Sequence, residues 1–261
     1  MNRKGNSAKL LFFVVLLLLS IGFLANRLIS KTESGEYKVF SSRVKFHLLK
    51  GLVYQHPMPQ YGYIHSDKYP AIVYVLGSGQ ESLEYKFKTV GRLYKEGMIK
   101  EILVGITPGI TEYSQKVGRN LTNDEWLVSG LEREGVASKD VEFTSLPPTL
   151  FGTFGEARTV SALAHSRRAK QLVLIASMHH TERVRLSFSH FNADNAFNVS
   201  IYGSEENAGI NELLKESLKL RLYRYLIIPA DRLFWTKLSP TANTIFHSAE
   251  VPVPRRGDPA H

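Results

Sequence analysis

Short apolar runs alternate with helical patterns from residue 71 onward, and this alternation constrains the fold more than any other feature. The runs occur at 71–77 (AIVYVLG), 101–106 (EILVGI), 141–146 (VEFTSL) and 171–177 (QLVLIAS), and a weaker one follows at 197–202. Runs of this length are typical of strands buried on both faces. Strands of this kind separated by helices predict an α/β, Rossmann-like layered fold with a mainly parallel sheet. The pattern leaves the strand order open.

The segments between these runs carry helical patterns. We predict helices over 81–97, 123–134, 154–168, 181–191 and 210–228, with Gly97 and Gly135 as C-terminal stops for the first two. In the last helix, two apolar sets occur at helical spacing. The first should pack on the sheet: Ile210, Leu213, Leu214, Leu218, Leu222, Tyr225 and Leu226. The second set is Leu220, Tyr223 and Ile227, and basic and aromatic residues follow at Arg232, Phe234 and Trp235. Burial on two sides explains the pattern, and a return of the segment's end to a membrane surface is the alternative.

Residues 10–25 (LLFFVVLLLLSIGFLA) form an apolar run without a polar face. A bilayer-spanning helix needs about 20 such residues, and Leu28 and Ile29 extend this one. Arg3, Lys4 and Lys9 precede it, which predicts a cytoplasmic N-terminus and an extracytoplasmic remainder. We therefore expect one N-terminal transmembrane helix before the α/β domain. A cleaved signal peptide is the alternative, but no clean small-x-small site follows the run.

These features divide the chain into four parts. We expect a membrane anchor over 1–29, a linker and juxtamembrane segment over 30–68, the α/β domain over 69–237 and a C-terminal tail over 238–261. Within the second part, residues 37–55 mix basic and apolar side chains, which favours a helix near the membrane surface.

Charge and composition exclude several classes of function. The net charge is +9, but residues 1–31 hold five basic residues and no acidic one, so the remainder has 28 basic against 24 acidic residues. We therefore expect no nucleic-acid partner. The chain has no cysteine, hence no thiolate ligand or cysteine nucleophile. Gly77-Ser78-Gly79 lacks the third glycine of a dinucleotide fingerprint and a Walker lysine, so ATP and NAD are not expected. We predict no cofactor and no metal site.

Four segments follow the predicted strands at the edge where ligands bind in parallel sheets, and their polar residues are candidates by position: 77–81, 106–114, 151–156 and 177–183. Gly77, Ser78 and Gly79 allow a backbone to approach a phosphate, although a tight turn explains them equally well. Thr153 and Glu156 stand at a helix start in capping-box spacing. That arrangement alone accounts for both residues.

The fourth strand ends at Ser177, and His180 and Arg183 follow on one face of the next helix start. An arginine at this end is mildly unfavourable for the helix itself, which favours an anionic ligand beside Arg183. Pairing of Arg183 with an acidic residue is the alternative. The neighbouring His179 is expected to be packed or solvated.

Three blocks resemble the signature of the YdcF/SanA/ElyC-like family of bacterial envelope proteins: AIVYVLGSGQE (71–81), GTFGEAR (152–158) and LVLIASMHHTERVRL (172–186). The matching positions are Gly77, Thr153, Glu156, Ala157, Ser177, His180 and Arg183. Gly152 departs from the asparagine usual in the family, and the usual Ser-Gly after the second strand is replaced here. The resemblance implies a single-pass protein of the bacterial inner membrane that takes part in envelope biogenesis.

On this basis we expect the domain to bind or act on a phosphate-containing, lipid-linked glycan, with membrane lipid as a further partner. His180 and Glu156 would serve as general acid or base in a transferase or hydrolase. Arg183, Thr153, Ser177, Gly77, Ser78 and Gly79 would bind the anion. Two alternatives stay open. One is a non-catalytic envelope assembly or ligand-binding factor. The other is a nucleotide-like ligand such as S-adenosylmethionine, whose binding is reported for a cytoplasmic relative.

Overall fold

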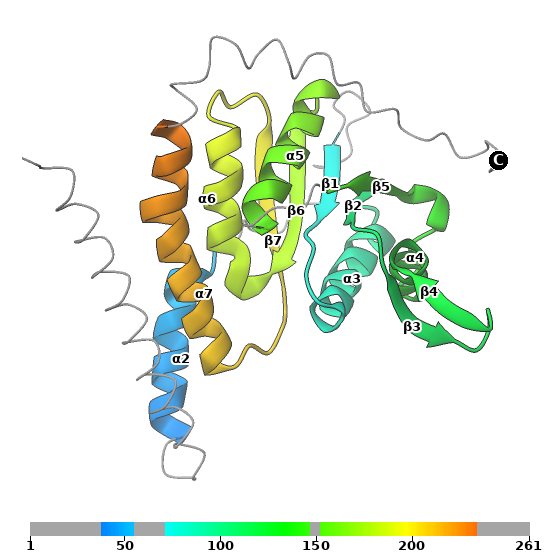
Figure 1. The fold of residues 1–261 in the computed structure, drawn as a ribbon, viewed down its shortest axis with the longest axis horizontal. Coiled ribbons are helices and arrows are strands. Elements are labelled where there is room, and N and C mark those ends of the chain that lie inside the picture. Colours follow the sequence, from blue (N-terminus) through cyan, green and yellow to red (C-terminus); the bar gives the residue numbers. More distant parts are fainter. Residues whose placement is uncertain (1–37, 55–70, 147–151, 234–261) are drawn as a thin grey trace, which may run out of the picture.

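The computed structural model describes residues 38–54, 71–146 and 152–233 (Figure 1). The predicted anchor at 10–25, most of the 30–68 segment, Phe234, Trp235 and the tail over 238–261 lie outside these ranges. Within the described residues, no helix has the length and apolar character needed to cross a membrane.

Five parallel strands form the central sheet. They are β1 (Ala71–Val75), β2 (Ile102–Ile106), β5 (Val141–Ser145), β6 (Gln171–Ser177) and β7 (Asn198–Ser204), in the spatial order β5-β2-β1-β6-β7. Every pairing in this sheet is parallel. The predicted α/β class with a mainly parallel sheet is thus confirmed. The order reverses between β1 and β6, which is where parallel sheets open a crevice for a ligand.

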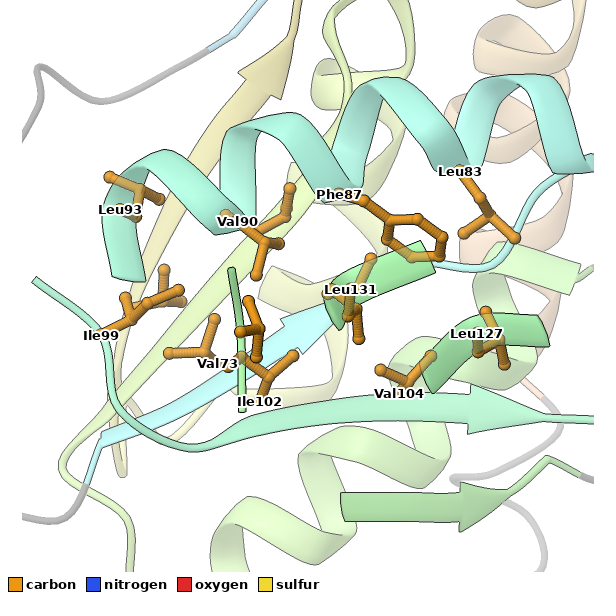
Figure 2. Close-up of a cluster of buried hydrophobic side chains, with 14 of the residues drawn as sticks. Val73, Leu83, Phe87, Val90, Leu93, Ile99, Ile102, Val104, Leu127 and Leu131 are labelled. Atoms are coloured by element: carbon orange, nitrogen blue, oxygen red, sulfur yellow. The ribbon is translucent and has the colours of Figure 1, made fainter. Parts of the chain in front are cut away.

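Helices cover both faces of this sheet because its strands are apolar on both sides. Val73 and Val75 of β1 point to α3 (Gln80–Lys95) and α4 (Asn123–Arg133), where they meet Phe87, Val90 and Leu131 (Figure 2). Ile72 and Tyr74, the alternating residues, belong to the core on the opposite face, beneath α5 (Gly152–Ser166) and α6 (Thr181–Phe191). The period-2 alternation of a strand therefore divides β1 between two cores.

The glycines predicted to end α3 and α4 do so. Gly97 has φ 68° and Gly135 has φ 88°, the left-handed conformation that glycine adopts without strain. Behind them, Met98 N donates to Leu93 O at 2.9 Å and Val136 N donates to Leu131 O at 3.1 Å. These backbone bonds close the last turns in the Schellman manner. A short 3-10 turn, η2 (Ser138–Asp140), then leads into β5.

The sequence patterns did not predict a hairpin, which the structure places between β2 and α4. Strands β3 (Ile110–Ser114) and β4 (Arg119–Thr122) pair antiparallel with each other and form a sheet of their own. Figure 1 shows the hairpin projecting on the side of the molecule opposite α2 and α7.

Helix α2 (Lys38–Leu52) confirms the helix expected within 37–55, and it packs on the domain. Its Leu52 joins Leu213 and Leu220 of α7 (Ile210–Leu222) in a small apolar cluster. Just beyond its end, Tyr54 N donates to Thr181 Oγ1 at 2.7 Å. Helix α2 is thus fixed to α6 and α7 (Figure 1).

The predicted final helix is present but faces the other way. After α7 the chain makes a π-helical turn, η4 (Tyr223–Ile227), and residues 228–233 continue as helix. The buried apolar side chains are Leu213, Leu220, Tyr223, Ile227 and Ile228, which are mostly the second apolar set. From the first set, the exposed fractions are 48% for Leu218, 38% for Leu222, 72% for Tyr225 and 49% for Leu226. The prediction that this first set packs on the sheet is wrong, because the helix packs at the sheet's edge against α2 and α6.

Candidate functional site

A cavity of about 790 Å³ lies at the carboxyl ends of β1, β2 and β5. Gly77 and Ser78 follow β1, Thr107 follows β2 and Leu146 follows β5, so the chain leaves all three strands at the edge of the sheet that borders the cavity. Helix α5 contributes Gly152, Thr153 and Glu156; Arg183 comes from α6, and Lys219, Leu222 and Tyr223 come from the end of α7. A cavity of this size can enclose a ligand as large as a drug molecule.

Glu156 is a buried carboxylic acid of this cavity. Its Oε1 accepts hydrogen bonds from Gly77 N at 2.8 Å and from the Tyr74 hydroxyl at 3.1 Å. Burial raises the pKa of Glu156, although these hydrogen bonds and the charge of Lys86 oppose the rise. The carboxyl group thus ties α5 to the turn after β1. This role differs from a capping box, since Thr153 already lies within α5 and is bonded elsewhere.

Lys86 supports the same turn from behind. Lys86 belongs to α3, and its side chain is buried. Its Nζ donates to Leu76 O and to Ser78 Oγ, both at 2.8 Å. Burial lowers the pKa of Lys86 to about 8, against the opposing effect of Glu156 and Glu206. The Gly77–Ser78 backbone therefore lies between a buried ammonium group and a buried carboxyl group.

Arg183 links three helices at the cavity wall. Its guanidinium forms a bidentate pair with Glu216 of α7, with Nη2 3.2 Å from Oε2, and it also donates to Thr153 Oγ1 of α5. Arg183 is 7% exposed and Glu216 only 2%. The guanidinium also lies over the Tyr223 ring, 5.3 Å from its centroid. Arg183 therefore pairs with an acid, as the alternative interpretation of the sequence held, and it still borders the cavity.

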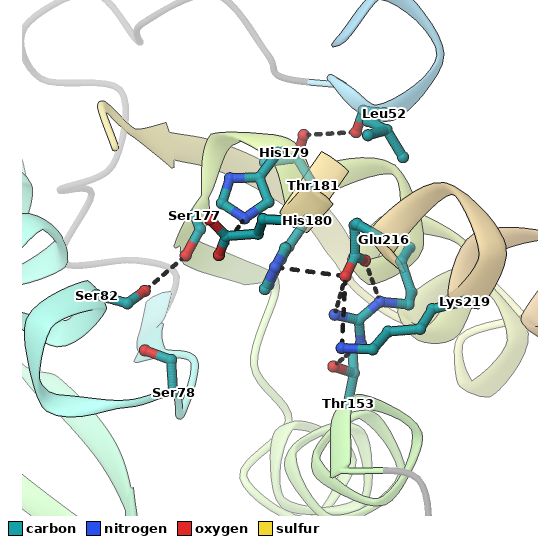
Figure 3. A network of polar contacts seen from close by, with 12 residues as sticks. Leu52, Ser78, Ser82, Thr153, Ser177, His179, His180, Thr181, Glu216 and Lys219 are labelled. Carbon is teal, nitrogen blue, oxygen red and sulfur yellow. Dashed lines mark hydrogen bonds and ion pairs between the residues drawn. The ribbon is translucent and has the colours of Figure 1, made fainter. Parts of the chain in front are cut away.

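The remaining predicted site residues lie beside the cavity and do not line it. Ser177 is buried and its Oγ lies 2.9 Å from Ser82 Oγ. Gly79 is the N-cap residue of α3. His180 ends the 3-10 turn η3 (Met178–His180), and its Nε2 lies 3.4 Å from Glu216 Oε2. Burial lowers the pKa of His180, and the charge of Arg183 adds to the effect. Figure 3 shows His180 between Ser177 and Glu216.

The opposite wall is largely apolar. Trp126 and Leu127 of α4, Val104 and Ile106 of β2, and Leu146 line it. The indole Nε1 of Trp126 donates to Glu112 of β3 at 3.1 Å, and Asn123 Nδ2 donates to Thr107 O at 2.8 Å. The hairpin thus holds this wall in place.

Four residues of the site escaped the analysis of the sequence: Lys86, Trp126, Glu216 and Lys219. Each stands within a helix, away from the segments that follow strands, so position after a strand could not identify it. Lys86 and Glu216 carried a signal, since each is a charged residue at a helix position otherwise occupied by buried apolar side chains.

The fold and the cavity together define an α/β domain built on one five-stranded parallel sheet, with a cavity at the carboxyl edge of that sheet. Comparison of the whole sequence with protein-family models and with curated proteins finds no match.

Proposed function

We propose that this domain binds a phosphate-bearing amphiphile, such as a polyprenyl-phosphate-linked glycan, and that it transfers or hydrolyses the phosphate-linked group. The observation that carries this proposal is the two-sided cavity. Arg183, Lys219 and the Gly77–Ser78 backbone form one side, and Trp126, Leu127 and Leu146 form the other.

The polar side suits an anion in both charge and geometry. Lys219 is exposed at the cavity wall, and its Nζ lies 3.9 Å from Glu216 Oε2, close enough to be shared with a ligand. Arg183 adds a positive charge at the cavity wall, and its guanidinium is held there by Glu216 and Thr153. Ser78 adds a hydroxyl held by Lys86. The phosphate would lie between the turn after β1 and the end of α7.

The apolar side suits the first carbons of a lipid chain or the face of a sugar ring. Trp126 offers an aromatic surface of the kind on which such groups stack. A free phosphate ion would leave this wall uncovered, so a ligand with both characters accounts for the cavity better than an inorganic anion.

Glu156 is the residue of this cavity best suited to proton transfer. Its raised pKa brings the carboxyl group closer to neutral pH, where a general acid or base works efficiently. His180 does not line the cavity, so we assign the acid–base role to Glu156 alone.

The test begins with mass spectrometry of molecules that co-purify with the detergent-extracted full-length chain. The candidate ligand is then offered as polyprenyl phosphate, inorganic phosphate and S-adenosylmethionine in parallel binding measurements. We expect polyprenyl phosphate to bind most tightly. Lys219→Ala should weaken this binding about tenfold, whereas Lys215→Ala, which removes the same charge one turn earlier on an exposed face of α7, should leave it unchanged.

Incubation with a polyprenyl-pyrophosphate-linked glycan distinguishes an enzyme from a binding factor. An enzyme consumes the glycan at a rate that Glu156→Gln lowers by at least about 100-fold. A ligand-binding factor, the second candidate function, holds the same molecule unchanged. Preferential binding of S-adenosylmethionine would overturn the proposal.

A further inference from the structure

His179 is the most unusual polar side chain in the described part of the chain. It is 1% exposed, yet neither ring nitrogen hydrogen-bonds to any residue that the structure describes. An imidazole carries one donor and one acceptor when neutral, and burying both without partners is costly. Among the described residues, only Ser161 has another buried side-chain polar atom in this condition. Both ring nitrogens of His179 therefore lack a hydrogen-bonding or cationic partner among the described residues.

Two further side chains of types that bind metal ions lie beside this ring. The rings of His179 and His180 lie edge to face with centroids 4.2 Å apart, and Glu212 of α7 places its Oε1 3.4 Å from His179 Nε2. One ligand atom from each of the three residues lies within 4.8 Å of the others. Figure 3 shows the two histidines next to each other between Ser177 and Glu216.

The spacing suits a metal ion better than a direct hydrogen bond. Ligands at zinc–nitrogen and zinc–oxygen bond lengths around a tetrahedral ion lie about 3.3 Å from one another. The His179–Glu212 separation of 3.4 Å agrees with that edge. It exceeds the ordinary length of a hydrogen bond between such groups.

The surroundings resemble those of a ligating histidine in a second respect. Glu216 Oε2 lies 3.4 Å from His180 Nε2, and its own orientation is fixed by Arg183. At this distance, which also exceeds an ordinary hydrogen bond, Glu216 places a negative charge beside the His180 ring, where ligating histidines commonly have a carboxylate. Ligands from η3 and α7 would also join two segments that meet at the edge of the cavity.

We propose that His179, His180 and Glu212 bind one Zn²⁺ ion or a similar transition-metal ion. Two imidazoles and one carboxylate suit Zn²⁺ and Co²⁺, whereas Mg²⁺ and Ca²⁺ prefer oxygen ligands. Three protein ligands leave a coordination position for water or for a ligand atom. The analysis of the sequence predicted no metal site because these residues, apart from the adjacent histidines, are far apart along the chain.

The test uses the tag-free, full-length chain in detergent, stripped with a chelator and then titrated with Zn²⁺ by calorimetry. Replacement by Co²⁺ gives a visible absorption band that reports the ligand geometry. We expect one ion per chain, a Zn²⁺-dependent rise in melting temperature and no effect of Mg²⁺.

Two variants remove ligands without opening the core. Glu212→Gln changes a side chain that is 52% exposed, so it should fold, and His179→Phe keeps an aromatic ring in the buried position. Each should weaken Zn²⁺ binding more than about tenfold. The matched controls are Glu132→Gln on α4 and His47→Phe on α2, both exposed and outside the three-residue cluster. They should bind Zn²⁺ as the natural chain does.

The proposal fails if the natural chain binds no Zn²⁺, or if either ligand variant keeps its full affinity. Since none of these measurements follows turnover or phosphate binding, failure here would leave the proposed function untouched. Conversely, a Zn²⁺ site could be established in a chain that binds no phosphate.

Discussion

Gly77 stands where strand β1 meets the cavity, and the space beside it belongs to Glu156. A Cβ at this position would lie 2.8 Å from Glu156 Oε1. Gly77→Ala should therefore displace the carboxyl group, cost about 1–3 kcal/mol of stability and reduce ligand affinity. At Gly79 a Cβ would meet nothing within 4 Å, and φ is −63° there, so Gly79→Ala should be tolerated. Thermal melts and binding assays of both variants check this. Equal effects would mean that Glu156 does not depend on the Gly77 backbone.

Arg183 is a structural residue as well as a candidate anion ligand. Its guanidinium is buried and paired with the buried carboxylate of Glu216, so the residue contributes to stability. Arg183→Ala removes the bidentate partner of the buried Glu216 carboxylate and should cost about 3–5 kcal/mol. Arg185→Ala, which removes a more exposed pair with Glu182, should cost less than about 1 kcal/mol.

A double variant separates charge from packing. Arg183→Met combined with Glu216→Met removes both charges and should recover most of the stability lost in Arg183→Ala. Chemical denaturation of the three variants measures the free energies of unfolding. If the double variant is no more stable than Arg183→Ala, packing or the Thr153 hydrogen bond is the larger contribution.

Lys86 should give the stability of the protein a recognisable pH dependence. Its pKa is about 8 in the folded chain and 10.5 in the unfolded chain, so the unfolded chain binds more protons between these values. The free energy of unfolding should therefore rise with pH across this window, by up to about 3 kcal/mol from this group. Below pH 8 both states are protonated and the contribution is constant.

Denaturant unfolding of the natural chain and of Lys86→Met, measured from pH 7 to 10, isolates this effect. Other titrating groups act alike in both proteins, so the difference between the two profiles belongs to Lys86. A difference that stays constant with pH would contradict the lowered pKa.

At the scale of elements, the exposed apolar residues of α7 and η4 invite a specific test. Leu218, Leu222, Tyr225 and Leu226 recur at helical spacing on an exposed face, and Leu222 also lines the cavity. Arg221 and Arg224 lie in the same turns, exposed. We predict that this face rests on an anionic lipid surface, with the cavity mouth toward the headgroups.

A chain that begins near residue 37 should float with anionic vesicles at low salt. Leu218→Ser with Tyr225→Ser should abolish flotation, and Val117→Ser with Tyr113→Ser, which alters exposed apolar residues of the hairpin, should not. A domain that ignores vesicles would leave membrane contact to the untested N-terminal segment.

The regular elements were predictable because each is specified by its own residues. Runs such as QLVLIAS at β6 are apolar on both faces, as a buried strand requires. Gly97 and Gly135 each mark a helix end where the backbone has a positive φ, which glycine adopts without strain. The β3–β4 hairpin was missed because its strands are polar and largely exposed, so they show no apolar alternation. The face of α7 was misjudged because the segment carries two apolar sets, and only tertiary packing against α2, α5 and α6 decides which is buried.

The residues of the candidate site also fall into two groups, those that the local sequence identifies and those that only tertiary packing brings to the site. Gly77, Ser78, Thr153, Glu156 and Arg183 were found because parallel strands end at a common edge. Lys86, Glu216, Lys219 and Trp126 come from helix interiors, and only the tertiary packing of α3, α4 and α7 brings them to that edge.

At the scale of the whole molecule, the remaining prediction concerns orientation. If residues 10–25 are an uncleaved anchor with a cytoplasmic N-terminus, a reporter fused after His261 should be active outside the cytoplasm. The membrane-bound protein should also retain Met1 on N-terminal sequencing. A mature chain that starts near residue 26 would indicate a signal peptide in place of an anchor.

The β3–β4 hairpin lines the cavity through Thr111 and supports Trp126 of its apolar wall, yet its strands pair with no strand of the five-stranded sheet. At the base of the hairpin Ile110 pairs with Thr122, so the hairpin leaves and rejoins the rest of the domain at one place. The hairpin is therefore a part of the cavity on which the pairing of the five-stranded sheet does not depend. Replacing it with another loop would change one side of the cavity and leave every strand pairing of that sheet in place.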